Sequence, residues 1–176
     1  MKFRSKEEEM FYDWLMELDE AGLVYDVEYE ECKFEICPKQ TYKKMVQLKT
    51  KTNMVEKHLL NPLVYTPDFT FSFCTLIDVC APEIAKVFEK SIDMNAVNRI
   101  IIDVKGSGSM FHDAKYFSAI QKIVYNDLGW YVQKIIPEKL FAKTFAPKKW
   151  RHKKNGEINA LGKRTLTLEQ MIDKNS

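Results

Sequence analysis

The segment Asn98–Lys105, with the sequence NRIIIDVK, constrains the fold more than any other part of the chain. Its apolar run is continuous, which is typical of a strand buried on both faces of a sheet beneath helices. Within it, Asp103 and Lys105 are separated by one residue, so both side chains point to the same face. A carboxylate and an ammonium on such a strand are costly unless they pair or carry out chemistry. The alternative interpretation is an ion pair at a strand end, which is nearly neutral in energy.

A second acidic residue, Asp68, lies in another segment that predicts a strand. Residues Leu63–Phe73 are rich in β-branched and aromatic side chains, with Pro67 near the start. Pairing of the two strands would bring Asp68 beside Asp103. Two adjacent carboxylates repel each other unless a hard divalent cation lies between them, and Mg²⁺ prefers such oxygen ligands. The alternative interpretation is that Pro67 and Asp68 form a turn that caps the strand.

The chemistry of such a site follows from its residue types. A bound metal ion can lower the pKa of a water molecule and stabilise charge on a phosphoryl oxygen. A neighbouring lysine, here Lys105, can orient the attacking water or offset charge on the phosphate. Asp68, Asp103 and Lys105 therefore predict magnesium-dependent hydrolysis, with Mn²⁺ as a substitute for Mg²⁺.

The hydrophobic pattern around these strands predicts an α/β fold. Of the 176 residues, 45% are hydrophobic and 30% charged, which fits one well-packed domain. The expected elements are helices over 5–21, 82–91 and 112–127, strands over 24–36 (with a break near 30–32), 63–73, 98–105 and 130–136, and a basic strand or hairpin over 39–57. Helices flanking a mixed central sheet are the expected architecture. The chain shows neither a signal peptide nor a membrane-spanning run, so a cytoplasmic protein is expected.

The motif Pro67-Asp68 followed by Asp103-Val104-Lys105 resembles that of the PD-(D/E)xK nuclease superfamily. The resemblance implies an αβββαβ restriction-endonuclease-like core and cleavage of DNA with Mg²⁺. It also implies that Asp68, Asp103 and the backbone carbonyl of Val104 bind the metal, and that Lys105 positions the water. One departure is the 34 residues between Asp68 and Asp103, which are many for a simple hairpin. An insertion over 75–97 is expected there, as a cap or a dimer contact.

The N-terminal sequence Ser5-Lys6-Glu7-Glu8 followed by Phe11 adds to this resemblance. It is similar to the S-K-x-E-x-x-F opening of small phage-encoded Holliday-junction-resolvase-like endonucleases. The similarity implies that Glu8 is a further catalytic and metal-binding carboxylate. Glu8 shares a helix face with Phe11, while Glu7 and Glu9 remain alternatives. The other interpretation is that Glu8 only stabilises the helix dipole.

A further stretch, Gly106…Phe111…Lys115, resembles the G-x(n)-F-x-x-x-K segment of the same nucleases. The resemblance implies that Lys115 approaches the scissile phosphate from the start of the helix over 112–127. The alternative is an ordinary solvated lysine on a helix surface.

Positive charge is concentrated in two segments. Residues 143–164 contain eight Lys or Arg against one acid, and residues 39–57 contain six Lys against Glu56, although the whole chain has a net charge of only +2. Such clustering points to a polyanionic partner. We therefore expect a nuclease domain over 1–142 and a basic C-terminal extension over 143–176 that holds DNA or is a disordered end. The expected DNA contacts in the extension are Lys148, Lys149, Arg151, Lys153 and Lys154.

These observations together predict a Mg²⁺-dependent DNA endonuclease. Contacts with the phosphate backbone carry little sequence information, which favours a structure-selective enzyme. A branched substrate such as a Holliday junction, a DNA recombination intermediate, follows from the resemblance alone. Two symmetric cuts would require a homodimer. The alternatives are a non-catalytic DNA-binding protein that keeps the fold, and an exonuclease or repair nuclease of the same superfamily.

Overall fold

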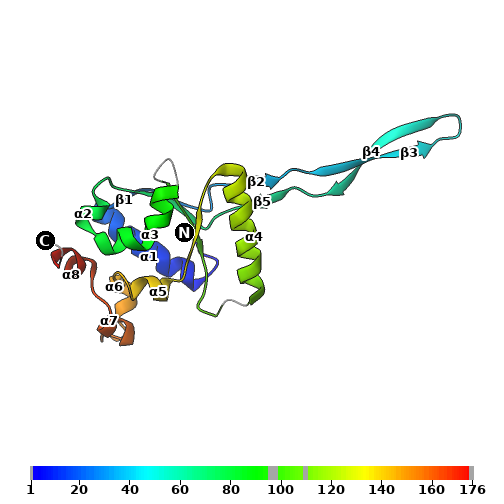
Figure 1. Cartoon of the computed structure of the whole chain (residues 1–176). Coiled ribbons are helices and arrows are strands. Elements are labelled where there is room, and N and C mark those ends of the chain that lie inside the picture. The colour runs from blue at the N-terminus through cyan, green and yellow to red at the C-terminus, as the bar shows by residue number, and fades with distance from the viewer. Residues whose placement is uncertain (1, 95–98, 109–110, 175–176) are drawn as a thin grey trace. The chain divides into compact units, whose positions relative to one another are not determined.

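The computed structural model describes residues 2–94, 99–108 and 111–174, which divide into two compact units (Figure 1). The larger unit, here called the body, runs up to Cys32 and continues from Pro67 to the C-terminal end. The smaller unit, Lys33–Thr66, is here called the arm. The expected boundary at residue 143 does not divide the chain, because the C-terminal segment packs into the body.

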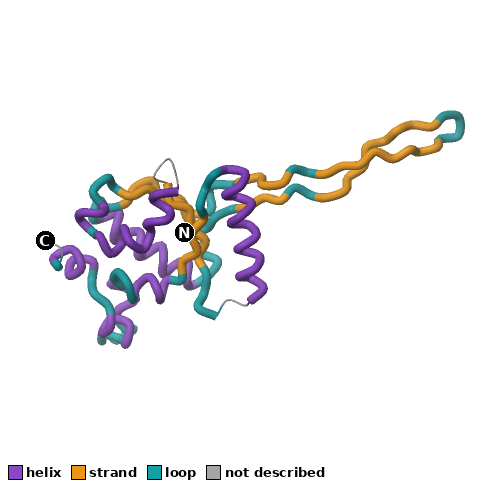
Figure 2. Tube along the Cα trace, in the orientation of Figure 1, coloured by secondary structure: helices purple, strands orange, loops and turns teal. Residues whose placement is uncertain are grey.

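The body is built around a four-stranded mixed sheet with the strand order β1-β6-β7-β8. β6 pairs with β1 and β7 in antiparallel orientation, whereas β8 runs parallel to β7. The strands are β1 (Val24–Tyr29), β6 (Phe69–Phe73), β7 (Arg99–Val104) and β8 (Val132–Ile135) (Figure 2). The mixed α/β architecture expected from the sequence is thereby confirmed. Asn98, the expected first residue of the third of these strands, lies outside the described residues.

Helix α1 (Lys6–Glu20) begins where the sequence predicts it. Ser5 is the N-cap, and its Oγ accepts a 3.1 Å hydrogen bond from the backbone N–H of Glu8. The apolar stripe of the helix is buried against the sheet. Phe11 is fully buried, with its ring centroid 5.2 Å from that of Phe69 on β6.

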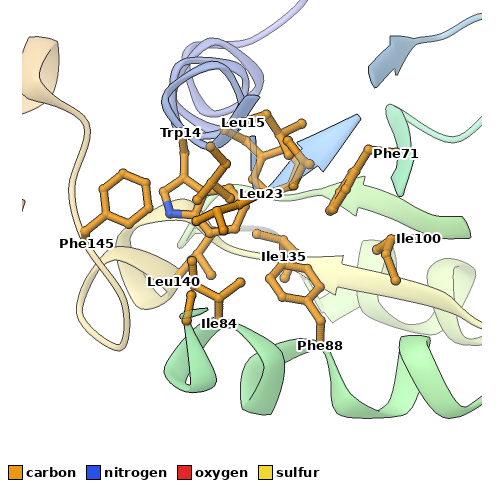
Figure 3. Packing of buried hydrophobic residues seen from close by; sticks show 14 of the residues in the cluster. Trp14, Leu15, Leu23, Phe71, Ile84, Phe88, Ile100, Ile135, Leu140 and Phe145 are labelled. Atoms are coloured by element: carbon orange, nitrogen blue, oxygen red, sulfur yellow. The ribbon is translucent and has the colours of Figure 1, made fainter. Parts of the chain in front are cut away.

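The insertion between β6 and β7 forms α2 (Ile77–Cys80) and α3 (Pro82–Met94). Ile84 and Phe88 of α3 are fully buried in the cluster that also holds α1 residues. The ring of Phe88 lies 5.8 Å from that of Trp14 (Figure 3). The insertion is therefore part of the main core, on the same side of the sheet as α1. Residues 95–97 of the expected insertion lie outside the described residues.

Helix α4 (Phe111–Leu128) covers the opposite face of the sheet. Gln121 of this helix donates a 2.7 Å hydrogen bond to the carbonyl of Val132 on β8. Phe117 is buried beside Lys134, whose Nζ is 5.8 Å from the ring centroid. Together with α1 and α3, this helix buries the sheet on both faces. None of the described helices, α4 included, is both long and apolar enough to cross a membrane.

The C-terminal segment folds against α1 instead of extending from the body. Phe145 is fully buried and stacks on Trp14 at 5.6 Å, and the indole N–H of Trp150 donates a 2.7 Å hydrogen bond to Asp13. Apolar residues further along, including Met171, complete the core. α5 (Pro137–Phe141) precedes the segment, and the described part of the segment contains the short helices α6 (Lys148–Arg151), α7 (Ala160–Arg164) and α8 (Leu168–Asp173). A packed part of the body therefore replaces the extension expected over 143–176.

The arm consists of two antiparallel ladders, one between β2 and β5 and one between β3 and β4. The hairpin expected over 39–57 is thus confirmed. Its turn is closed by a 2.8 Å hydrogen bond from the N–H of Leu48 to the carbonyl of Lys51. The strands are β2 (Phe34–Cys37), β3 (Gln40–Gln47), β4 (Thr52–Leu60) and β5 (Leu63–Tyr65).

Two predicted strands are each divided between the body and the arm. The break expected near residues 30–32 in the strand over 24–36 is confirmed, since β1 ends at Tyr29 and Glu30 adopts a positive φ of 52°. The predicted strand over 63–73 breaks between Tyr65 and Phe69. Both breaks lie where the chain passes between the two units.

Candidate active site

Asp68 and Asp103 come together because β6 begins where the antiparallel strand β7 ends. Phe69 is paired with Ile102, and the backbone N–H of Asp68 donates a 3.0 Å hydrogen bond to the carbonyl of Ile102. The carbonyl of Asp68 in turn accepts a 3.0 Å hydrogen bond from Glu30. Backbone hydrogen bonds to strands on both sides therefore fix the position of Asp68 beside the end of β7.

The side chain of Asp68 is held by the backbone of the motif itself. Its Oδ2 accepts a 2.6 Å hydrogen bond from the N–H of Val104, the residue between Asp103 and Lys105. This charge-assisted bond restricts the carboxylate to one orientation at the end of the two strands. The structure thus brings together the three residues that the sequence predicts as the centre of the site.

Both carboxyl groups have raised pKa values. Burial raises the pKa of Asp68 from 3.8 to about 7, with a further contribution from the charge on Asp103. Burial also raises the pKa of Asp103, which is only 6% exposed, although Lys105 opposes this shift. Burial without a countercharge disfavours the ionised form of a carboxyl group. A cation placed between these two groups would relieve that cost.

Lys105 is the cation nearest to Asp103 among the described residues. Its Nζ lies 2.9 Å from Asp103 Oδ2, and its backbone N–H donates to the carbonyl of Ile135 on β8 at 2.8 Å. The side chain of Lys105 is 31% exposed, whereas that of Asp103 is 9% exposed. The ammonium group therefore lies between the shielded carboxylate and solvent.

The structure distinguishes the three consecutive glutamates at the start of α1. Glu8 is buried, and its charge contributes to the raised pKa of both Asp68 and Asp103. Glu9 forms an ion pair with Lys149 at 2.7 Å. Glu7 reaches the residue after the motif, because a Cβ placed on Gly106 would lie 3.4 Å from Glu7 Oε1. Of the three, Glu8 is the one coupled electrostatically to both aspartates.

Hydrogen bonds hold Glu8 in the manner of a helix cap. Its oxygens accept from the Ser5 hydroxyl at 2.9 Å, from the Arg4 N–H at 3.0 Å and from the Tyr29 hydroxyl at 2.6 Å. Burial and the bond to Glu8 raise the pKa of Tyr29, which stays protonated and donates. Sequence reasoning did not identify Tyr29 as a site residue, because an aromatic residue in an alternating strand usually belongs to the core.

Lys134 is a second residue that the sequence analysis did not select. It is paired in register with Asp103 across the parallel strands β7 and β8, and its side chain is exposed. Its charge lowers the pKa of Asp103, against the larger effect of burial. The alternating pattern of β8 predicts that Lys134 is exposed. That it lies beside Asp103 follows only from the register of β8 against β7.

The fit of the site to a metal ion depends on two carboxylates. Among the described residues, no three His, Cys, Asp or Glu side chains are grouped so as to hold a metal ion. Mg²⁺, however, is commonly bound by one or two carboxylates, with waters and substrate phosphate oxygens as the other ligands. Asp68 and Asp103, with the backbone carbonyl of Val104 between Asp103 and Lys105, fit that requirement in donor chemistry.

Most of the predicted DNA-binding residues of the C-terminal segment have other partners. Lys148 pairs with Glu169 at 2.7 Å, and Lys153 pairs with Glu157 at 2.9 Å. Arg151 is buried and donates to the carbonyl of Thr165 at 2.6 Å.

Lys149 bridges Glu9 at 2.7 Å and Asp13 at 3.0 Å, both on α1. Lys154 and, on α4, Lys115 are exposed. The side chain of Phe111, which belongs to the motif that suggested Lys115, lies outside the described residues.

Comparisons with known proteins give no match, since no family model, no curated protein and no solved structure resembles the chain closely enough to be aligned with it. The geometry of the residues above therefore carries the functional argument.

Proposed function

We propose that this protein is a Mg²⁺-dependent DNA endonuclease with its active site at Asp68, Asp103 and Lys105. One observation carries the proposal: two shielded carboxylates lie at the adjoining ends of β6 and β7, with a lysine 2.9 Å from one of them. Clusters with such perturbed pKa values are typical of catalytic sites.

The order of elements in the body supports this proposal. Without the arm and the α2–α3 insertion, the chain runs α1, β1, β6, β7, α4, β8. This order is the αβββαβ sequence implied by the resemblance to the PD-(D/E)xK superfamily. It puts the proposed ligands at the end of the central antiparallel pair, where two strands can present both carboxylates to one substrate. We therefore propose a restriction-endonuclease-like core.

Each proposed active-site residue has a distinct task. Asp68 and Asp103, with the Val104 carbonyl, would hold Mg²⁺, which supplies an activated water and stabilises charge on the scissile phosphate. Lys105 would orient the attacking water and donate to the phosphate oxygens. Glu8 would add negative charge behind the two aspartates and so favour the binding of a cation there. Lys115 on α4 is proposed to contact the substrate backbone.

Branched DNA is the proposed substrate class. Resolution of a four-way junction needs two cuts related by symmetry, so the active form is proposed to be a homodimer with one site per subunit. Lysine contacts to phosphates depend on the path of the DNA backbone and not on the base sequence. Such contacts suit an enzyme that selects DNA by its shape.

A cleavage assay on three substrates tests the proposal. Purified protein with Mg²⁺ should cut a labelled four-way junction faster than a linear duplex of the same sequence, with supercoiled plasmid reporting nicking. Asp103→Asn and Lys105→Ala should each reduce the rate by about 100-fold or more. Asp173→Asn, at an exposed carboxylate on α8, is the matched control and should leave the rate unchanged. Cleavage that survives both site variants would exclude this site, and Mg²⁺-independent DNA binding without cleavage would indicate a non-catalytic binding protein.

A further inference from the structure

The arm concentrates positive charge on a hairpin that has almost no buried surface. Residues 33–66 contain seven Lys and two Glu, a net of five positive charges. Every residue of β4 is exposed, as is every residue of β3 except Val46. A two-stranded hairpin is at best marginally stable by itself in water. The arm is therefore an exposed, charged ribbon that contributes little to the core.

The register of β3 and β4 gives the ribbon two different faces. Lys44 is opposite Val55 and Tyr42 is opposite Lys57, so these four side chains share a face with the pair Val46 and Asn53. This face, here called the basic face, contains no acidic residue. The other face contains Thr41, Lys43, Met45, Gln47, Thr52, Met54, Glu56 and His58.

The hairpin turn adds Lys49 and Lys51 at the end of the ribbon. Residues 33–66 are all described, and no ion pair occurs within them, whereas Lys148, Lys149 and Lys153 of the C-terminal segment are each paired with an acid. The two basic segments of the sequence therefore differ in how far their cations are paired with acids. Four of the eight C-terminal cations, Lys148, Lys149, Arg151 and Lys153, are bonded within the body, whereas the lysines of the hairpin are exposed and form no ion pair.

We propose that the arm is a DNA-binding ribbon whose basic face enters the major groove of duplex DNA. The major groove is about 12 Å wide and admits a two-stranded β-ribbon. The eight residues of β3 span roughly 25 Å at the usual rise per residue, enough for several side chains of the basic face to lie within the groove. Lys44 and Lys57 would reach the phosphates that border the groove, and Lys49 and Lys51 would do so at the tip.

The net positive charge of the arm favours DNA, and not a second copy of the chain, as the binding partner of the basic face. Two arms packed together would oppose five positive charges with five more, which is strongly unfavourable for self-association. Neutralisation by phosphates instead releases counterions and is favourable. The inference rests on the proposed function only for the identity of the polyanion, and it locates the main DNA contact on the arm.

The test measures binding without cleavage. Fluorescence anisotropy of a labelled duplex, in EDTA and over a range of salt concentrations, reports on affinity independently of any nuclease chemistry. The arm variant carries Lys44→Ala, Lys49→Ala, Lys51→Ala and Lys57→Ala. Its affinity should fall by about 10-fold or more near physiological salt, and the slope of log Kd against log salt should fall by about 0.9 for each phosphate that the variant no longer neutralises.

Two controls separate the arm from general charge effects. A body variant with Lys2, Lys86, Lys90 and Lys139 changed to Ala removes the same charge from exposed positions, and it should retain the wild-type salt slope. Methyl green, which occupies the major groove, should displace the protein, whereas netropsin in the minor groove should not. Equal losses in the two variants, or displacement by netropsin alone, would overturn the proposal.

Oligomeric state and cleavage complete the design. If the arm variant binds DNA normally but sediments as a smaller species than the wild type, the arm is a dimer contact and the proposal is wrong. Arm-dependent binding in a protein that never cleaves DNA would support the ribbon and reject the nuclease. Cleavage by a protein whose DNA binding does not depend on the arm would support the nuclease and reject the ribbon.

Discussion

The hydroxyl of Tyr29 donates a 2.6 Å hydrogen bond to Glu8 Oε2, and this contact joins the end of β1 to the first turn of α1. It is a structural link between the two elements that flank the proposed metal ligands. Because Glu8 acts electrostatically on both Asp68 and Asp103, Tyr29 helps to set the charge environment of the site without being part of it.

Tyr29→Phe removes this bond and leaves Glu8 less firmly held. We expect a loss of about 1–2 kcal/mol in the free energy of unfolding, because the bond involves a charged acceptor. We also expect the Mg²⁺ concentration for half-maximal cleavage to rise several-fold. Thr167→Ala is the comparison, since it weakens the N-cap of α8 by about 1 kcal/mol and removes no contact of Glu8. If Tyr29→Phe changes stability alone, Tyr29 is structural and does not position Glu8.

The raised pKa of Asp68 makes metal-free stability depend on pH. The folded protein holds a proton on this group up to about pH 7, whereas the unfolded chain releases it near 3.8. The stabilising contribution is therefore complete below pH 4 and is lost as pH rises through 7. Burial of Asp103 acts with the same sign. The lowered pKa values of Glu28 and Glu169 affect stability only in more acidic solution. Burial also raises the pKa of Glu17, which acts with the same sign, so the comparison with Asp68→Asn is what isolates Asp68.

Urea unfolding in EDTA at pH 5 and pH 8 measures this effect. The wild type should lose roughly 1–3 kcal/mol more than Asp68→Asn across this interval. Mg²⁺ added at pH 8 should restore part of the loss in the wild type only, and its binding should release a proton near pH 7. Parallel pH profiles for the two proteins would show that Asp68 does not titrate in this window.

Lys134 should affect the pH dependence of cleavage more than its maximum rate. Its charge favours the ionised form of Asp103, so Lys134→Ala should raise the pKa of that group and move the acidic limb of the rate profile to higher pH. The shift should be a few tenths of a pH unit, since an exposed lysine is screened by solvent. Lys139→Ala, an exposed lysine on α5, should leave the profile in place. A profile that does not move, with a uniformly lower rate, would indicate a substrate contact instead.

Local patterns in the sequence were sufficient to predict most of the body. The apolar run before Asp103 predicts β7, Ser5 predicts the start of α1, and the helical pattern over 112–127 predicts α4, because each signal depends on nearby residues only. The convergence of Asp68 and Asp103 was also predictable, since it needs only that two neighbouring strands pair.

Contacts between distant residues account for what the sequence did not reveal. The basic C-terminal segment resembles a free DNA-binding tail, but its Lys149 forms ion pairs with Glu9 and Asp13, and the ring of Phe145 stacks on Trp14. More than 120 positions separate these partners, so no periodicity within the segment can indicate them. The same limit applies to Tyr29 and Glu8, whose contact depends on how α1 crosses the sheet.

Gly162 offers a test of the packing of the C-terminal segment. A Cβ at this position would lie 2.5 Å from the carbonyl oxygen of Arg151 and 2.8 Å from Cγ2 of Ile158. Alanine is normally the better helix former by up to about 1 kcal/mol. Here the clash with backbone should outweigh that gain, so Gly162→Ala should lower the free energy of unfolding by about 1–3 kcal/mol. At Gly108 an added Cβ would meet nothing within 4 Å, so Gly108→Ala is the matched control and should change stability little. Because the segment covers α1, urea unfolding of the Gly162 variant should shift the whole transition of the body. A separate early transition of the C-terminal residues would show that they unfold independently of the core.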